Sequence, residues 1–474
     1  MNNQPGNFIW RECGLILTGV ALLLGTTVDL APNLIWHDQQ RVEQIVLLGI
    51  VALAVTLWLK TPVIPLVSLP GPSRWALGLG FMLGCVSAGL SAYPRFAGLE
   101  WSTLLLLTGL TFVLAEQAWA RRHCFDILAI RLMLGLAVVI ALKIMAAYMA
   151  AIVEGMRLDT LALFEGTFSN RRVFGQVASL LVPLLAYPLL LERMPRIQRW
   201  GVFALLTVWW MLVIVSGTRG TWMALAVASL TLAVVAWQAS SAWLRIQVSA
   251  LGVGALLFGI LFVGLPTWLV VDASLENRLI NFATLSGREV LWGIAWEQIQ
   301  AHPWLGIGPM HFAAIRNNFG AHPHNAVLQL AAEWGIPAAL AFIVPIGFGI
   351  LRLLAKIRQQ EVTSGPLFVC LTASILAISA QSMVDGVLVI PYTQTWLVLI
   401  AGWTLGVYFR DVVVPHVSIS GRTHLGISIL SLIVVSALLY GIFPEVLNRV
   451  EVTQVYADGG KLIPPRYWGV GWIP

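Results

Sequence analysis

Long apolar runs recur along almost the whole of this sequence. Each is roughly 18 to 22 residues long, which lets a helix cross a hydrocarbon core about 30 Å thick. The runs are continuously apolar, whereas the strands of a transmembrane barrel would alternate in polarity over about ten residues. Composition agrees, because 58% of the 474 residues are hydrophobic and only 11% are charged. The chain is therefore expected to be a helical membrane protein and not a soluble globular one.

The spacing of these runs predicts an all-α polytopic membrane protein, a bundle of about 12–13 transmembrane helices with a small helical lid on the extracytoplasmic side. The runs lie near residues 14–31, 43–59, 74–92, 98–116, 127–150, 173–191, 199–216, 220–239, 244–265, 336–354, 366–384, 391–409 and 423–443. The predicted domains are an N-terminal bundle of about nine transmembrane helices (1–265), a loop or lid domain (266–324), C-terminal transmembrane helices (325–443) and a polar C-terminal tail (444–474).

Lysine and arginine are distributed unequally between the two alternate sets of short loops. With the N-terminus in the cytoplasm, one set holds fourteen of these residues and the other six, so the first set is expected to be cytoplasmic. The 266–324 loop then lies outside the cytoplasm. The same bias accounts for most of the net charge of +6, so no nucleic-acid partner is expected. The four cysteines show no CxxC spacing and imply neither a disulfide framework nor a metal site.

Two arginines occupy a position that is unfavourable for a cation. Arg171 and Arg172 follow Ser169 and Asn170, an expected N-cap, and so fall in the first turn of a helix whose positive dipole end disfavours cations. A bound anion would resolve this conflict; the alternative is that both arginines reach to the membrane interface. Gln176 lies one turn beyond Arg172 on the same helical face and continues a polar stripe, so it is a candidate for lining a cavity or for contact with an acceptor molecule.

Arg219 lies in a turn of a few residues, SGTRG (216–220), between two long apolar runs. So short a turn cannot carry the guanidinium far from the membrane surface. Its two glycines allow close backbone approach and can leave amide groups for a phosphate, which an arginine would hold in a bidentate manner. The alternative is an arginine that only caps a tight helical hairpin.

Two histidines precede the first apolar helix after the large loop. Pro323 suits the first position of that helix, which would place His324 in its first turn. The helix dipole would then lower the pKa of His324 and keep its ring neutral, as a general base for a hydroxyl requires. His322 and Asn325 are candidates for contact with the acceptor, the molecule that carries this hydroxyl, or for lining the cavity that holds it. The alternatives are a structural role for His324 or a metal site, although no His-x₃-His spacing supports a metal.

Arg288 opens the most regular part of the large loop. The sequence REVLWGIAWEQIQ (288–300) predicts a short amphipathic helix, and a second helix is expected from Pro309 to about Phe319. Arg288 either folds over the end of the bundle where Arg171, Arg172 and Arg219 are expected, or it pairs with a glutamate of its own helix.

Three ionisable side chains fall inside apolar runs: Lys143, Glu333 and Asp385. Such groups are costly in a membrane unless they are paired or face a polar cavity. Buried structural pairing is the default expectation for all three, and each is also a candidate cavity residue.

Five short motifs occur in a fixed order and on one side of the membrane. They are SNRRVFGQ (169–176), SGTRG (216–220), SGREVLW (286–292), HPWLGIGPMHF (302–312) and HPHNAVLQLAAEWGI (322–336). In this order they closely resemble the O-antigen ligase and O-antigen polymerase superfamily, membrane glycosyltransferases that use undecaprenyl diphosphate-linked glycans. The resemblance implies about twelve transmembrane helices, a periplasmic lid and essential residues at the positions of Arg219 and His324. An additional apolar run at 423–443 departs from the usual twelve.

This resemblance implies an O-antigen ligase of the bacterial inner membrane, with its active site on the periplasmic side. The donor would be an undecaprenyl diphosphate-linked glycan and the acceptor lipid A-core, within lipopolysaccharide biosynthesis and among membrane lipids. Arg171, Arg172, Arg219 and Arg288 would bind the diphosphate, with no metal and no cofactor, and His324 would activate the acceptor for inverting transfer. The alternatives are an O-antigen or exopolysaccharide polymerase or a protein O-oligosaccharyltransferase, which share this chemistry, and a transporter or flippase.

Overall fold

The computed structural model describes most of the chain. It covers residues 13–29, 34–58, 64–159, 162–269, 271, 273–274, 287–359, 365–412, 420–446, 466–469 and 471–473. Much of the predicted polar tail and residues 275–286 of the predicted lid therefore lie outside the described residues.

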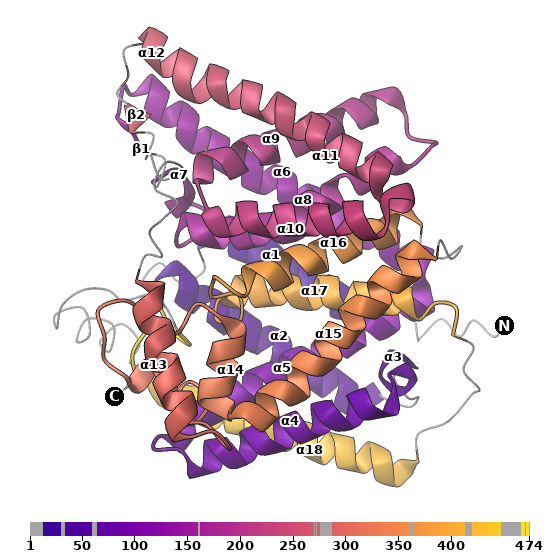
Figure 1. Ribbon diagram of the computed structural model, residues 1–474, viewed down its shortest axis with the longest axis vertical. Helices are drawn as coiled ribbons and strands as arrows, with labels where there is room; N and C mark the ends of the chain where they lie inside the picture. Colours follow the sequence, from indigo (N-terminus) through magenta and orange to yellow (C-terminus); the bar gives the residue numbers. More distant parts are fainter. Residues whose placement is uncertain are drawn as a thin grey trace.

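Helices make up nearly all of the described structure (Figure 1). The long helices are α1 (Cys13–Thr27), α2 (Trp36–Trp58), α4 (Gly71–Leu90), α5 (Pro94–Arg121), α6 (His123–Val153), α8 (Arg171–Leu185), α9 (Arg196–Ser216), α10 (Arg219–Val235), α11 (Trp237–Phe258), α13 (Arg288–Ala301), α15 (Ile336–Arg358), α16 (Pro366–Gln381), α17 (Pro391–Tyr408) and α18 (Gly421–Val446). The short ones are α3 (Ile64–Ser68), α7 (Ala162–Glu165), η2 (Tyr187–Leu190), η3 (Gly259–Gly264), α12 (Leu265–Leu269), η4 (His311–Ala314) and α14 (Ala326–Trp334). Two-residue strands β1 (Leu158–Asp159) and β2 (Ala273–Ser274) pair in parallel.

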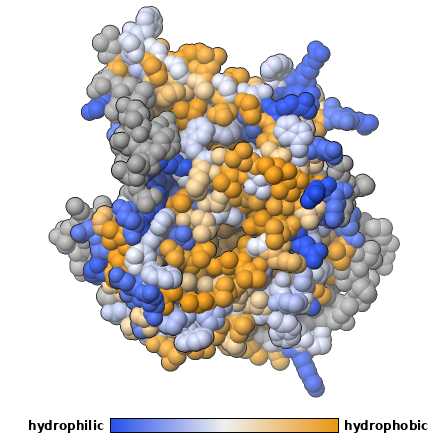
Figure 2. Space-filling view, viewed as in Figure 1, coloured by the Kyte–Doolittle hydropathy of each residue, from blue (hydrophilic) through white to orange (hydrophobic). Residues whose placement is uncertain are grey.

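Each of the predicted apolar runs overlaps one or more of these helices, so the all-α polytopic class is confirmed. Eight of the described helical segments are long and apolar enough to cross a membrane by length and composition. Hydrophobic residues cover the middle of the face shown in Figure 2, and hydrophilic residues gather toward its left and right ends. This distribution is what a bundle in a hydrocarbon layer requires.

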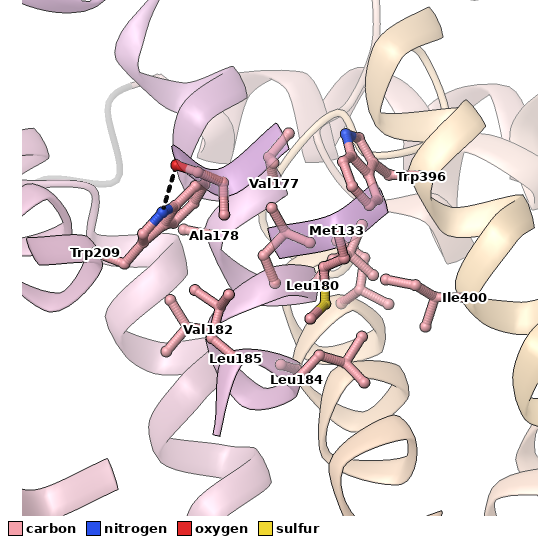
Figure 3. Packing of buried hydrophobic residues seen from close by; sticks show 14 of the residues in the cluster. Met133, Val177, Ala178, Leu180, Val182, Leu184, Leu185, Trp209, Trp396 and Ile400 are labelled. Carbon is pink, nitrogen blue, oxygen red and sulfur yellow. Dashed lines mark hydrogen bonds between the residues drawn. The ribbon is translucent and has the colours of Figure 1, made fainter. Parts of the chain in front are cut away.

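The centre of the bundle is built around α8, of which every residue except Arg172 is buried. Val177, Leu180 and Leu184 of this helix pack among side chains of α6, α9 and α17 (Figure 3). Beside it, α17 lies directly against α5, because side chains at Gly402 and Gly406 would collide with the α5 backbone. Small residues at such contacts let membrane helices approach closely. The result is a rigid framework from which the loops at one end project.

The lid lies at the left end of the bundle in Figure 1, where α13 packs against α14. The predicted amphipathic helix over 288–300 is confirmed as α13. The helix predicted from Pro309 to Phe319 is wrong, because only the single turn η4 forms there. Met310, the second residue of the predicted helix, has a φ of 68°, and this left-handed backbone cannot be part of a right-handed helix.

The last described residues return to this same end. The backbone N–H of Ile473 donates to the carbonyl of Ala313 in η4, at 3.3 Å. Tyr467, Trp468 and Ile473 share a buried cluster with Met310 and with α18. The C-terminal segment and the lid therefore lie on the same side of the bundle, as the additional helix α18 requires.

We expect the lid and the far end of α15 to lie on opposite sides of the membrane. Trp296 is exposed on α13, and Gln359 is exposed just after α15. Trp296→Cys should therefore react with a membrane-impermeant thiol reagent added from outside the cytoplasm, and Gln359→Cys only after the membrane is broken. The parent chain with its four free cysteines gives the background. The reverse pattern would invert the orientation deduced from the arginine bias.

Candidate functional site

The first site element is the start of α8. The side-chain oxygen of Asn170 accepts hydrogen bonds from the backbone N–H groups of Arg172 and Val173, at 2.8 and 3.3 Å, which confirms the predicted N-cap. Arg172 is half-buried, whereas Arg171 is buried. A Cβ at Gly217 would lie 3.9 Å from Nη1 of Arg171, so Arg171 extends to the turn between α9 and α10.

That turn is the second element, and it places Arg219 at the first residue of α10. Gly217 ends α9 in the left-handed conformation, with a φ of 57°, which reverses the chain in very few residues. Three hydroxyls brace the turn, because Thr218 Oγ1 lies 2.9 Å from both Ser216 Oγ and Thr221 Oγ1. The half-buried Arg219 is thus held next to the N-terminal end of α8. Gly175 of α8 has no side chain there and leaves room for Thr218 and Thr221.

The third element is the loop before α14. The side chain of Asn325 caps α14 by accepting from the N–H groups of Val327 and Leu328, both at 3.0 Å. The helix therefore begins at Ala326, and the prediction that Pro323 starts it and that His324 lies in its first turn is wrong. An asparagine side chain at the N-cap satisfies two orphan N–H groups, which proline at the first position does not.

His324 instead lies just outside the helix, with a φ of 55°. Non-glycine residues adopt this left-handed conformation only when the surroundings hold them there. Its backbone N–H donates to Nδ1 of His322 at 3.2 Å, and the centroids of the two rings lie 4.0 Å apart with the rings tilted by 60°. The indole of Trp292 on α13 donates to the carbonyl of Pro323 at 3.0 Å. The lid helix and the histidine loop are thereby joined.

A carboxylate completes the group. Asp385 follows α16, is buried, and places Oδ1 at 4.0 Å from Nδ1 of His324. Gln381 connects it to the rest of the site by donating to Asp385 Oδ2 at 3.2 Å and to Thr221 at 3.4 Å. Ser179 of α8 in turn donates to Gln381 at 2.5 Å. The sequence suggested Asp385 only as a buried ionisable residue and did not indicate its nearness to His324.

Electrostatic coupling shows that three of the predicted arginines share this site. Burial lowers the pKa of His324 to about 3, and the positive charges of Arg172 and Arg288 add to the effect. Burial also lowers the pKa of Arg288; Asp385 raises it, and Arg172 and Arg219 lower it. The lowered pKa expected for His324 is confirmed, but burial is its main cause, because the ring does not lie in a helix N-terminus. The site combines a cluster of cations with a neutral imidazole.

The remaining predicted residues lie at the edges of this cluster. Gln176 is buried further along α8, where its side-chain oxygen accepts from Thr393 at 2.7 Å. Asn325 uses its amide to cap α14 and to donate to the carbonyl of Met383 at 3.0 Å. His322 is buried against Gly386, and burial and the neighbouring His324 hold its pKa well below 6.5.

The part of the chain that the structure describes contains no group of three His, Cys, Asp or Glu side chains arranged to hold a metal ion. Within the site itself, the charged groups are predominantly arginines. Their guanidinium groups bind phosphate oxygens and repel metal cations.

A comparison with family models matches residues 202–343 to the O-antigen ligase family. The matched segment contains Arg219, Arg288 and His324, and it ends within α15. Arg172 and Asp385 lie outside it. No curated protein matches the chain.

Proposed function

We propose that this chain, which carries an O-antigen ligase domain over residues 202–343, transfers a glycan from undecaprenyl diphosphate to lipid A-core on the periplasmic side of the bacterial inner membrane. The domain itself indicates a ligase or polymerase type of glycosyl transfer. The observation that carries the proposal is the meeting of Arg172, Arg219 and Arg288 with a neutral His324 at one end of the bundle.

The arginine cluster suits the diphosphate of the donor. Arg172, Arg219 and Arg288 are half-buried and come from three different helices, α8, α10 and α13. A guanidinium offers parallel N–H groups to phosphate oxygens, and such charge-assisted bonds are about twice as strong as neutral ones. The positive field also stabilises the charge on the departing diphosphate. The arginines would therefore hold the donor and activate its leaving group.

His324 suits the acceptor hydroxyl. As the acceptor oxygen bonds to the anomeric carbon, the bond from that carbon to the diphosphate oxygen breaks, and its electron pair leaves with the diphosphate. The hydroxyl proton passes to the neutral imidazole of His324. The carboxylate of Asp385, 4.0 Å from Nδ1, stabilises the imidazolium that forms. Attack from the face opposite the diphosphate inverts the anomeric configuration.

The place of the cluster favours an enzyme over a transporter or flippase. Arg172 and Arg219 lie in the first turns of α8 and α10, and His324 immediately precedes α14. These are helix ends at the lid side, whereas transporters hold their polar sites near the bilayer midplane between repeated halves.

Incubation with defined acceptors tests the proposal. Purified protein in proteoliposomes is given a lipid-linked glycan donor together with lipid A-core, a second lipid-linked glycan or an acceptor protein. We expect transfer to lipid A-core. Transfer only to the second lipid-linked glycan would assign a polymerase, and transfer only to protein would assign an O-oligosaccharyltransferase.

We expect transfer to be independent of pH between about 5.5 and 8. A base must be neutral to act, so activity is lost as the pH falls through the pKa of His324, which is about 3. A histidine with the ordinary pKa near 6.5 would lose roughly tenfold by pH 5.5. The measurement is kcat/KM for the donor, which reports groups of the free protein. Arg288→Gln removes a positive charge near His324, so its loss of activity should begin at a higher pH.

We also expect transfer to survive chelation. The arginines supply the positive charge that Mg²⁺ supplies in many enzymes acting on diphosphates. Assays with and without EDTA, at matched ionic strength, check this. Activity that disappears with EDTA and returns with Mg²⁺, Mn²⁺ or Zn²⁺ would contradict it.

A further inference from the structure

The C-terminal segment contains a buried arginine that binds two glutamates. Arg466 is only 1% exposed. Its Nη2 lies 2.7 Å from Oε2 of Glu100 on α5 and 2.5 Å from Oε2 of Glu333 on α14. The amide of Gln329, one turn before Glu333, faces the same guanidinium. The segment thus connects the core of the bundle to α14.

Glu333 is a junction between α14 and the lid. Its second carboxylate oxygen accepts from the backbone N–H of Phe312 in η4, at 3.0 Å. Its backbone carbonyl accepts from the N–H of Gly308 at 2.9 Å and from Ser87 of α4 at 3.2 Å. Glu333 is itself fully buried, so its carboxylate requires the charge of Arg466.

His324 lies just before the opposite end of α14, next to the N-cap Asn325. From Glu333 to the N-cap Asn325 the helix rises roughly 12 Å, at about 1.5 Å per residue. A helix this short moves as a rigid rod. Its tilt and depth therefore depend on the contacts at its two ends, among them the pair of Arg466 with Glu333 and the contact of Asn325 with Met383.

The segment is itself firmly held on the bundle. The fully buried Arg41 of α2 donates to the carbonyl of Tyr467 at 3.0 Å and lies over the Tyr467 ring. At the other end, Arg316 of the lid donates to the carbonyl of Ile473 at 3.3 Å and lies over Trp472. The segment that begins with Arg466 is therefore anchored at Tyr467 and again at Trp472 and Ile473, and Arg466 can fix the position of α14.

We propose that Arg466 is a positioning residue for the transfer reaction, which acts through Glu333 and α14 to hold His324 against the acceptor. This inference rests on the proposed function of His324. It also assigns a function to α18 and to the C-terminal segment (466–469 and 471–473). The contacts described for these two elements do not include Arg172, Arg219 or Arg288. A displacement of about 1 Å at a reacting group can lower a rate roughly 100-fold.

The test is a double-mutant cycle between Arg466→Lys and His324→Ala. Lysine keeps the charge, but its single ammonium cannot reproduce the fork with which the guanidinium faces Glu100, Glu333 and the Gln329 amide at once. We expect Arg466→Lys to lower kcat about 10- to 100-fold while the KM for donor changes less than about threefold. In the His324→Ala background the same substitution should change the residual kcat less than about twofold, because both act on one step.

Arg95→Lys is the matched control. Arg95 pairs with Glu445 of α18 at 2.7 Å, on the same side of the bundle. Among the described residues no hydrogen bond or ion pair joins Arg95 to α14, so Arg95→Lys should retain kcat. If Arg466→Lys does not fold, Glu333→Gln releases the same attachment from the α14 side and should reproduce the loss.

Two results overturn the positioning role alone: wild-type kcat in both variants, or losses that multiply in the double variant while His324→Ala is impaired. Normal transfer by His324→Ala would instead overturn the proposed function, and the positioning role with it.

Discussion

His324→Ala should lower single-turnover transfer by roughly 10²–10⁴, the usual contribution of a general base. Donor binding should remain close to that of the wild type, because the proposed diphosphate contacts are made by Arg172, Arg219 and Arg288. His324 is 6% exposed and its neutral ring adds no charge to the donor site, so its removal leaves the positive field in place. Donor affinity and transfer are measured on the same folded, membrane-inserted preparation.

His324→Asn separates proton transfer from positioning. Asparagine can still hydrogen-bond the acceptor hydroxyl and favours the left-handed conformation that residue 324 adopts, but it cannot take the proton. It should therefore remain as impaired as alanine. His302→Ala, at an exposed histidine of the lid, is the control and should be active. Near-normal transfer by His324→Asn would rule out base catalysis, and near-normal transfer by His324→Ala would remove His324 from the site.

Arg219→Ala should impair donor binding, the step that precedes transfer. It removes charge-assisted hydrogen bonds to the diphosphate, each worth about 1.5–3 kcal/mol, so donor Kd should rise roughly 10- to 150-fold. Arg219→Lys should recover little of this, because an ammonium cannot offer the planar pair of N–H groups. Binding of a lipid-linked donor to protein in nanodiscs measures the effect.

Arg245→Ala is the control for Arg219. Arg245 is exposed on α11, outside the cluster, and its loss changes net charge equally. Unchanged donor affinity in Arg219→Ala, or an equal loss in Arg245→Ala, would contradict a specific contact between Arg219 and the diphosphate.

Features that depend on a few neighbouring residues were predictable from the sequence. The length of each apolar run predicts a membrane-spanning helix, because a hydrocarbon layer imposes that length on every span. The N-cap at Asn170 and the short turn before Arg219 follow from local chemistry and were found. The start of α14 was misplaced by three residues, because capping by Asn325 outweighs the preference of proline for a first turn.

Features that depend on distant residues were not predictable. Arg466 and Glu100 are 366 positions apart, and nothing in either neighbourhood indicates their contact. The same holds for Asp385 and His324, which meet because α16 and the histidine loop end at one side of the bundle. Arg288 had two expected partners, and only packing of the lid could decide that it joins Arg172 and Arg219.

The most direct measurement follows both products of a single turnover by purified protein in proteoliposomes. A donor of known anomeric configuration is supplied with lipid A-core in the presence of EDTA. We expect one glycosylated acceptor for each undecaprenyl diphosphate released, with the anomeric configuration inverted. A retained configuration would exclude direct attack by an acceptor that His324 activates. A donor that crosses the bilayer unchanged, with no glycan transferred, would contradict glycosyl transfer at this site altogether.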